Sequence, residues 1–318
     1  MKTNIKDIFV TAGLLLGLTM PSPAAAVQCG DTIGPNVDET LTGSITCDNP
    51  AVALTIVGPA KVDLTNFSIL CDDANHDYLR PSGLVILGKG ARIQGGFVSG
   101  CFSGVSVEGE GGHVVENVQV EFSRVHNFFV GSSKNTLRQN QATRGLVGFV
   151  TGDQSSGNRL LGNIAERNLV GFGVDFGSKH QLYRNYAYAN AYAGFSLSGE
   201  GHTVSQNEAA DNTNFGFFLL FAEKNIVLKN RALRNGSSGF AIDSGDQHQL
   251  TENVARLNGA NGILLTDTRA SKMIDNVASD NNQDKTIDFF DLNDDVPNCD
   301  TNVWEGNTFG TANQPCIH

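Results

Sequence analysis

Asparagine recurs along this chain at an almost constant interval, and this spacing limits the possible folds more than any other feature. The eight asparagines follow one another by 22 or 23 residues: Asn117, Asn140, Asn163, Asn185, Asn207, Asn230, Asn253 and Asn276. A repeat of this length is typical of a solenoid, in which each unit buries its apolar face against its neighbours. The spacing therefore predicts a row of stacked units.

Other positions of each unit repeat in the same register. An apolar residue stands three positions before each asparagine: Val114, Leu137, Leu160, Leu182, Val204, Val227, Leu250 and Met273. A small or polar residue stands five positions before it: Gly112, Asn135, Asn158, His180, His202, Asn225, His248 and Ser271. Alanine follows two positions after the asparagine in most units, and a second asparagine follows five positions after it in most units. This agreement indicates a repeated structure.

The units are predicted to be short strands. Segments such as Gly-Phe-Ala-Ile-Asp from Gly239 alternate apolar and polar residues, as in a strand with one buried face. Helical repeats need more than about 30 residues per unit. We therefore predict coils of three strands stacked about 4.8 Å apart. We place each asparagine at a tight corner, because asparagine tolerates left-handed backbone and its amide can bond the asparagine one coil away.

The asparagine-punctuated coils with Gly-Phe or Gly-Ile strands resemble the right-handed parallel β-helix repeat proteins of the pectin-lyase-like superfold. The pattern covers roughly residues 41–310. The resemblance implies an all-β, right-handed parallel β-helix, and no specific enzyme family is matched. The superfold includes lyases, hydrolases, epimerases, adhesins and proteins without known activity, so it specifies the fold better than the function.

The first residues have the features of a secretory signal peptide. Lys2 and Lys6 precede an apolar stretch that ends near Met20, and three alanines follow at residues 24–26. We expect residues 1–26 to be removed and residues 27–318 to form one β-helix domain, secreted or periplasmic. Removal takes two lysines and one aspartate, which changes the formal charge from −11 to −12. This charge argues against nucleic acid and anionic membranes as partners, and no other segment suits a membrane span.

Six cysteines remain, which in a secreted protein suggests three disulfides. Cys71 and Cys101 occupy ladder-equivalent positions of adjacent coils, so we predict that they are bonded. Proximity in sequence then pairs Cys29 with Cys47 and Cys299 with Cys316. Such bonds would close the terminal coils, whose strand edges are otherwise unpaired. A zinc site is the alternative, but no C-x₂-C pair occurs.

Acidic residues near the ends of the Gly-led strands form the first candidate catalytic site. Asp243 and Asp267 lie one coil apart, and Arg269 follows closely. Clustered carboxylates can raise one pKa for general acid chemistry or hold a cation, and Arg269 would meet a substrate carboxylate. The alternative is that these acids are solvated turn residues.

A loop that breaks the repeat supplies the alternative catalytic set, His76, Tyr78 and Arg80. These residues could abstract a proton next to a carboxylate and stabilise the enolate, although a charged cap loop is the plainer interpretation. His180, His202 and His248 share one register with asparagines, so we interpret them as a structural polar ladder.

Two further features bear on ligands. Asp291, Asn293 and Asp295 have the oxygen spacing of a calcium loop, but Val296 replaces the expected glycine, so the match is weak. Phe218, Leu220 and Phe290 are predicted to face outward and to stack on sugar rings or receive a partner. The Gly-His-Gly and Asp-Pro-His signatures of polygalacturonase-like and alginate epimerase-like members are not found.

Two functions remain open from the sequence. The first is a secreted, carbohydrate-active protein that processes an acidic polysaccharide by lyase, epimerase or hydrolase chemistry. The second is a non-catalytic extracellular β-helix that binds carbohydrate or a surface partner. In either case we expect a monomer whose partner is a polysaccharide or cell-surface glycan. The sequence identifies no certain cofactor, and Ca²⁺ is the one ion for which it offers a candidate site.

Overall fold

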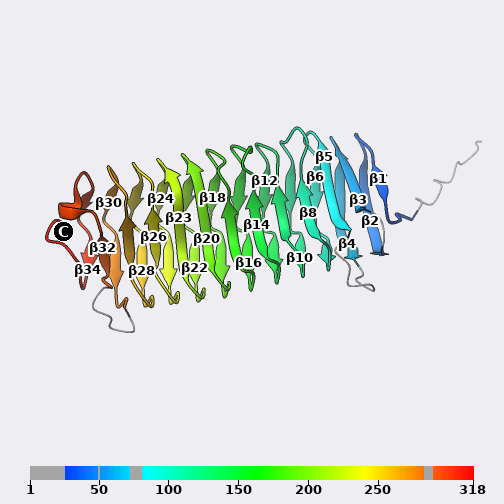
Figure 1. The fold of residues 1–318 in the computed structure, drawn as a ribbon. Coiled ribbons are helices and arrows are strands. Elements are labelled where there is room, and N and C mark those ends of the chain that lie inside the picture. The colour runs from blue at the N-terminus through cyan, green and yellow to red at the C-terminus, as the bar shows by residue number, and fades with distance from the viewer. Residues whose placement is uncertain (1–25, 49–50, 72–80, 283–288) are drawn as a thin grey trace, which may run out of the picture.

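Short parallel strands lie side by side along one axis, from β1 to β34 (Figure 1). The structure, a computed structural model, describes residues 26–48, 51–71, 81–282 and 289–318. Each regular coil contributes one strand to a 12-stranded sheet, here called sheet A, and two to a larger sheet. Every pairing is parallel, in register with the coils before and after. The predicted all-β parallel β-helix is confirmed.

The strands form three rows. Sheet A consists of β1 (Asp31–Ile33), β3 (Val52–Gly58), β5 (Ser82–Gly88), β8 (Ser103–Val107), β11 (His126–Val130), β14 (Val147–Thr151), β17 (Val170–Val174), β20 (Ala193–Glu200), β23 (Phe215–Glu223), β26 (Phe240–Asp243), β29 (Ile263–Thr266) and β32 (Leu292–Asp294). Row B1 consists of β6 (Arg92–Gln94), β9 (Val114–Glu116), β12 (Thr136–Arg138), β15 (Arg159–Leu161), β18 (Gln181–Tyr183), β21 (Thr203–Ser205), β24 (Ile226–Leu228), β27 (Gln249–Thr251), β30 (Lys272–Ile274) and β33 (Val303–Glu305). Row B2 consists of β7 (Phe97–Ser99), β10 (Gln119–Glu121), β13 (Gln141–Thr143), β16 (Ile164–Glu166), β19 (Tyr186–Tyr188), β22 (Glu208–Ala210), β25 (Arg231–Leu233), β28 (Val254–Arg256), β31 (Val277–Ser279) and β34 (Thr308–Phe309). The long strands β2 (Asp38–Cys47) and β4 (Lys61–Cys71) begin both B rows, and a short 3₁₀ helix, η1 (Pro297–Cys299), lies near the end.

The interior is built from rows of identical or similar side chains. Six phenylalanines of sheet A stack with ring centroids 4.6 to 4.9 Å apart: Phe128, Phe149, Phe172, Phe195, Phe217 and Phe240. The predicted internal row of Leu182, Val204, Val227 and Leu250 is confirmed, because all four are fully buried and pair in register in row B1. Burial of each such side chain stabilises the fold by about 1.5 to 3 kcal/mol.

The asparagine row forms a continuous hydrogen-bond ladder at the corner between rows B1 and B2. Asn163 donates from its backbone N–H and its Nδ2 to Oδ1 of Asn185, at 2.9 and 3.1 Å, and from Nδ2 to the Leu137 carbonyl at 2.9 Å. The buried amide is therefore fully paired. The ladder runs on to Asn307, whose Oδ1 accepts from Asn276.

The predicted first rung of this ladder is wrong by one residue. Val115 pairs with Leu137, so the partner of Asn140 one coil earlier is Val118, whose N–H donates to Asn140 Oδ1. Asn117 is exposed, with a φ of 57°. By the same shift Val115 replaces Val114 in the apolar row, and His113 replaces Gly112 in the polar row. The spacing misled because two asparagines 23 residues apart occupy different positions of a 22-residue coil.

The left-handed backbone also lies one residue earlier than predicted. Positive φ values occur at the residue before the ladder asparagine, for example Arg184 at 55° and Lys229 at 56°. The asparagine that follows uses its side chain to bond the neighbouring coil. Left-handed backbone costs a non-glycine residue about 1 to 2 kcal/mol, which the buried ladder offsets.

The three predicted disulfides are present. Cys29–Cys47 and Cys299–Cys316 lie near the two ends, and Cys71–Cys101 joins successive early coils. The described residues contain no free cysteine. The zinc interpretation of these cysteines is therefore excluded, because all six sulfur atoms are bonded in pairs.

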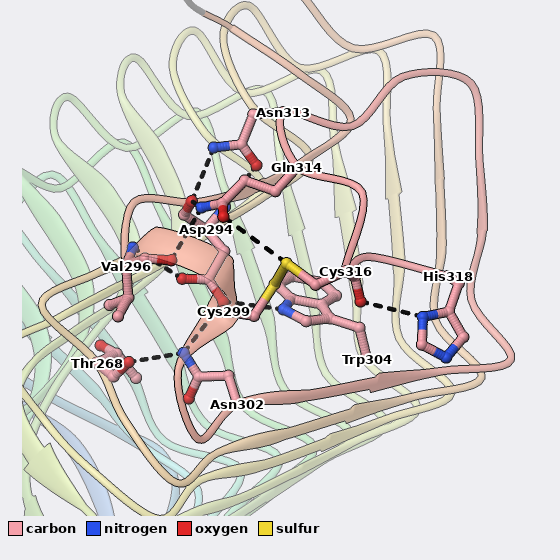
Figure 2. Close-up of a disulfide and its surroundings, with 10 residues drawn as sticks. All are labelled: Thr268, Asp294, Val296, Cys299, Asn302, Trp304, Asn313, Gln314, Cys316 and His318. Carbon is pink, nitrogen blue, oxygen red and sulfur yellow. Dashed lines mark hydrogen bonds between the residues drawn. A yellow bond between two sulfur atoms is a disulfide. The ribbon is translucent and has the colours of Figure 1, made fainter.

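The last coil is closed by buried polar contacts beside the Cys299–Cys316 disulfide (Figure 2). The buried Asp294 carboxylate accepts from Trp304 Nε1 at 3.0 Å and Asn302 Nδ2 at 3.1 Å. Trp304 is only 1 % exposed and packs against the end of the core. The carbonyl of Asp294 accepts from Asn313 and Gln314, which holds the terminal segment across the open end.

Within the described ranges, no helix has the length and hydropathy needed to cross a membrane. The predicted signal segment 1–26 and the loop that carries His76, Tyr78 and Arg80 lie outside the described residues, apart from residue 26.

Candidate functional site

The strands of sheet A all end along one side of the solenoid, where the chain turns toward row B1. Because every strand is parallel, the residues that follow them form one continuous edge, here called the sheet A edge. Loops at the carboxyl ends of parallel strands are frequent positions for functional groups. The outward side chains and this edge contain most of the residues singled out from the sequence.

A groove of about 600 Å³ follows the edge across four coils, just after β14 and β17 and along the last residues of β20 and β23. Its lining includes the acidic residues Asp153, Glu200 and Glu223 and the aromatic residues Phe176 and Phe221. Phe176 is 64 % exposed and Phe221 is 59 % exposed. Lys224 pairs with Glu223 at 3.5 Å. The groove is therefore both acidic and aromatic.

A further carboxylate, that of Asp175, lies beside this groove. Asp175 follows β17 directly, next to Asp153. Partial burial of the carboxyl group, reinforced by the Asp153 carboxylate, raises the pKa of Asp175. Raising one carboxyl pKa beside an ionised partner is the arrangement used for proton donation in glycoside hydrolysis.

The predicted outward apolar residues lie on the neighbouring part of sheet A. Phe217 and Leu219 are fully buried, whereas Phe218 and Leu220, which alternate with them along β23, are half-exposed, as predicted. Phe218 stacks on Phe215 with centroids 4.7 Å apart and meets Tyr192 edge-on at 6.4 Å. This aromatic cluster gives the outer face a flat apolar surface next to the groove.

Phe290 lies farther along the solenoid and is half-exposed. Its N–H donates to Asn261 Oδ1, and its carbonyl accepts from Gly262 at the start of the β29 coil. The aromatic cluster around Phe218 contains Tyr192 and Phe215 but not Phe290.

The acids predicted as catalytic, Asp243 and Asp267, lie four and five coils farther along the same edge than the start of the groove. Asp243 ends β26 and pairs with Thr266, so Asp267 lies one residue later in register, as expected from the sequence. The Asp267 N–H donates to Asp295 Oδ1 at 3.0 Å. Partial burial raises the pKa of Asp295, and the nearby carboxylates of Asp294, Asp267 and Asp243 add to this effect. The structure therefore brings Asp243 and Asp267 together with Asp295.

Arg269 makes different contacts from those expected. Its guanidinium pairs with Asp300 at 3.5 Å, and its backbone N–H donates to Asp246 at 2.9 Å. These contacts connect the turn that contains Arg269 to the corresponding turns of the coils on both sides. Arg269 thus already has an anionic partner, which weakens its predicted role as receptor of a substrate carboxylate.

The three oxygen-bearing residues proposed as a calcium loop have separate structural roles. Asp291 is buried, and its two carboxylate oxygens accept hydrogen bonds from Asn281, Gly310 and Thr311. It thereby ends the second asparagine ladder. Asn293 donates to Asn261, and Asp295 accepts from Asp267. Over the described ranges, no group of three or more His, Cys, Asp or Glu side chains is arranged to hold a metal ion.

The histidine register is structural, as interpreted from the sequence. Nδ1 of His180 accepts the Asn158 N–H at 3.1 Å, and Nδ1 of His202 accepts the His180 N–H at 3.1 Å. Both rings are buried and stacked 5.1 Å apart. Burial, with the neighbouring His202 ring, lowers the pKa of His180 to about 4. These neutral rings replace ladder asparagines beneath the groove.

The groove residues Phe176, Glu200 and Phe221 were missed from the sequence. They lie at the carboxyl ends of the Gly-led strands, where the residue type is not repeated from coil to coil. The repeat pattern therefore did not identify them as candidates. One signal was present: an aromatic residue follows directly after the alternating strand at both Phe176 and Phe221. Interpreting it required the register between coils, which only the structure supplies.

Known structures share this fold at low sequence identity. The A-module of the Azotobacter vinelandii mannuronan C-5 epimerase AlgE6 is 16 % identical, with 90 % of this chain and 87 % of that one covered and a TM-score of 0.70. The periplasmic alginate epimerase AlgG is also 16 % identical, with 88 % and 77 % covered and a TM-score of 0.65. The catalytic domain of a GH87 α-1,3-glucanase in complex with nigerose is 12 % identical, with 90 % and 63 % covered and a TM-score of 0.52.

These likenesses establish the fold alone. No curated protein matches the sequence significantly. The family described as the right handed beta helix region matches residues 82–201 and 169–309, which together cover most of the chain. The parallel coils, the buried asparagine ladder and this match agree, and the chain belongs to the right-handed β-helix family.

Proposed function

We propose that this protein is an extracellular or periplasmic polysaccharide-binding β-helix that holds its glycan along the sheet A edge. The observation that carries the proposal is the open groove lined by Phe176 and Phe221, together with the outward aromatic cluster of Phe218 on β23, the strand that also contains Phe221. Aromatic faces stack on the apolar faces of sugar rings, and the carboxylates beside them accept hydrogen bonds from hydroxyl groups.

Two further observations support this proposal. Similar folds include proteins whose names refer to alginate epimerisation and glucan cleavage. Three disulfides are typical of proteins that fold outside the reducing cytoplasm. A solenoid also presents equivalent positions at about 4.8 Å intervals, which suits a polymer laid along its axis.

The test is direct binding of pectate, alginate, a neutral β-glucan and chitosan, measured by affinity electrophoresis and calorimetry. The variant Phe218→Ala removes the centre of the outward cluster while leaving the buried Phe217 stack intact. We expect the parent to bind at least one polymer and this variant to bind it about 2- to 10-fold more weakly. Absence of binding to all four polymers would contradict the proposal.

A second candidate function is glycan cleavage at the acid cluster of Asp243, Asp267 and Asp295. The specific observation is the raised pKa of Asp295 beside two further carboxylates, which suits one residue to donate a proton while another stays ionised. Catalysis would then occur on the same edge as binding, a few coils away.

Asp243→Asn and Asp295→Asn test this second function. If the cluster is catalytic, either change abolishes release of reducing ends or unsaturated products from the polymer that the parent cleaves, with the melting temperature nearly unchanged. Asp211→Asn is the matched control, because Asp211 is an exposed acid at a different corner. Full activity in both cluster variants would assign catalysis elsewhere, with His76, Tyr78 and Arg80 as the next candidates.

A further inference from the structure

Two phenylalanines at the groove expose their side chains at turns of the sheet A edge. Phe176 and Phe221 are the most exposed large hydrophobic side chains among the described residues, at 64 % and 59 %. Their φ angles are 41° and 50°, and the same left-handed turn continues in the next coils at Ser244 and Asp267, with φ angles of 58° and 44°. The turn therefore belongs to the fold, and the unusual feature is the large apolar ring that two of its coils expose there.

The two rings flank a gap of one coil. Ser178 bridges to Glu200, and Gly199 pairs with Ala222, so Phe176 and Phe221 occupy the same position two coils apart. Two coil spacings correspond to about 10 Å along the axis. In the intervening coil Ser198 holds the equivalent position, followed by Gly199 without a side chain. All three coils line the groove, and the part of the groove over the intervening coil, with Phe176 on one side and Phe221 on the other, is here called the slot.

The intervening coil has a glycine at its turn. Gly199 has a φ of 95°, and a Cβ there would lie 2.2 Å from the Gly177 carbonyl oxygen. Any larger residue would have to displace the backbone of the preceding coil. Glycine at this position therefore preserves the turn and the close stacking of the two coils.

The negative charge of the groove lining favours one class of sugar over another. The groove lining includes three carboxylates, Asp153, Glu200 and Glu223, and within the part of the chain that the structure describes only Glu223 of these forms an ion pair, with Lys224. An anionic uronate would meet like charge here, which disfavours binding. A protonated amino group would instead form charge-assisted hydrogen bonds with the carboxylates and favourable cation–π contacts with the rings.

We infer that the slot between Phe176 and Phe221 is a subsite for one hexosamine ring of a cationic polysaccharide. The inference rests on the proposed function and specifies its substrate class. One apolar face of the pyranose stacks on each phenyl ring, and the ammonium group faces Glu200 and Asp153. This assignment replaces the acidic glycan expected from the sequence with a basic one at this position of the edge.

The experiment compares glucosamine, glucose and galacturonate oligosaccharides of equal length by calorimetry with the full chain. We expect the glucosamine oligomer to bind most tightly. Phe176→Ala and Phe221→Ala should each weaken it about 2- to 10-fold, and Glu200→Gln should weaken it while leaving the glucose oligomer unaffected. Phe122→Ala is the matched control, since Phe122 is an exposed phenylalanine with φ 55° at another corner.

Distinct results overturn the subsite and the broader function. If the Phe176→Ala and Phe221→Ala variants bind an oligomer as tightly as the parent does, the slot is not the subsite, but polysaccharide binding by the protein is still supported. Tighter binding of galacturonate than glucosamine would overturn the charge argument. If none of the oligomers and none of the longer polymers binds, the proposed function itself fails. Circular dichroism and thermal melting establish that each variant is folded.

Discussion

The side chain of Asn127 donates from Nδ2 to Oδ1 of Asn168 at 3.0 Å, although the two residues are separated by 41 positions. Asn127 occupies a position in β11 that is glycine in the coils on both sides, Gly104 and Gly148. Gly145 stands where the second asparagine ladder would continue, and its N–H donates to the same Asn168 oxygen. Asn127 therefore fills, from a different strand, the ladder position that Gly145 leaves empty.

This exchange predicts strong coupling between positions 127 and 145. Asn127→Gly should destabilise the fold by about 1 to 3 kcal/mol, because buried ladder groups lose their partner. Gly145→Asn should also destabilise it, since the new Cβ would lie 2.8 Å from Asn127 Nδ2. The double variant restores the regular pattern and should recover most of the stability. Urea unfolding of all four proteins checks this, and strictly additive losses would contradict it.

Leu182 in row B1 tests the internal packing. It is fully buried in the predicted leucine and valine row, so Leu182→Ala should reduce the free energy of unfolding by about 2 to 5 kcal/mol. Leu169→Ala is the control, because Leu169 is 43 % exposed and should change stability little. Thermal melting of both variants is the measurement. Equal melting temperatures for the two would be inconsistent with the packing described.

The buried histidines predict that stability falls on mild acidification. Burial lowers the pKa of His180 and of His248 to about 4, below the ordinary value of 6.5. The folded state therefore binds fewer protons than the unfolded state. The stabilisation is fully present above pH 6.5 and is lost as the pH falls toward 4. At about pH 5 the loss is about 2 kcal/mol for each ring.

The repeat supplies a matched control for this pH effect. Asparagine occupies the same register at Asn158 and Asn225, where its Oδ1 accepts the same kind of backbone N–H. A His180→Asn, His248→Asn variant should keep the ladder and lose the part of the slope between about pH 7 and pH 5 that these two rings supply. His113, His126 and His202, whose pKa values burial also lowers, should keep their part. Free energies of unfolding measured across that range decide the matter. An unchanged slope would assign the pH dependence to other groups.

The Cys299–Cys316 disulfide should hold the last coil in place. It closes a segment of 17 residues, for which the loss of loop-closure entropy amounts to about 3 kcal/mol. Replacing both cysteines by serine should increase amide exchange in β33 and β34 more than in the central coils, because terminal coils have a neighbour on one side only. Uniform exchange along the solenoid would show that the bond has no local role.

The sequence by itself determined the coil length, the three strands per coil, the internal apolar rows and all three disulfides. The reason is that each coil has the same packing and hydrogen-bonding environment as its neighbours, so the same residue pattern recurs in each coil. Leu182 and Val204 could be assigned to one row because they occupy the same position in successive coils.

The tertiary structure alone decided matters that depend on exact register or on side chains that leave the pattern. Asn117 belonged to the spacing but not to the ladder, because its coil is one residue shorter than the interval suggested. Asn127 hydrogen-bonds to Asn168 of the second asparagine ladder, although Asn127 lies on a sheet A strand and not at the repeated asparagine position. The same holds for the site, since strand pairing alone shows that Phe176 and Phe221 occupy the same position on either side of one coil. The repeat shows which residues occupy equivalent positions in successive coils. The proposed binding residues are those that differ from the repeat, and their contacts depend on side chains of neighbouring coils, which only the tertiary structure shows.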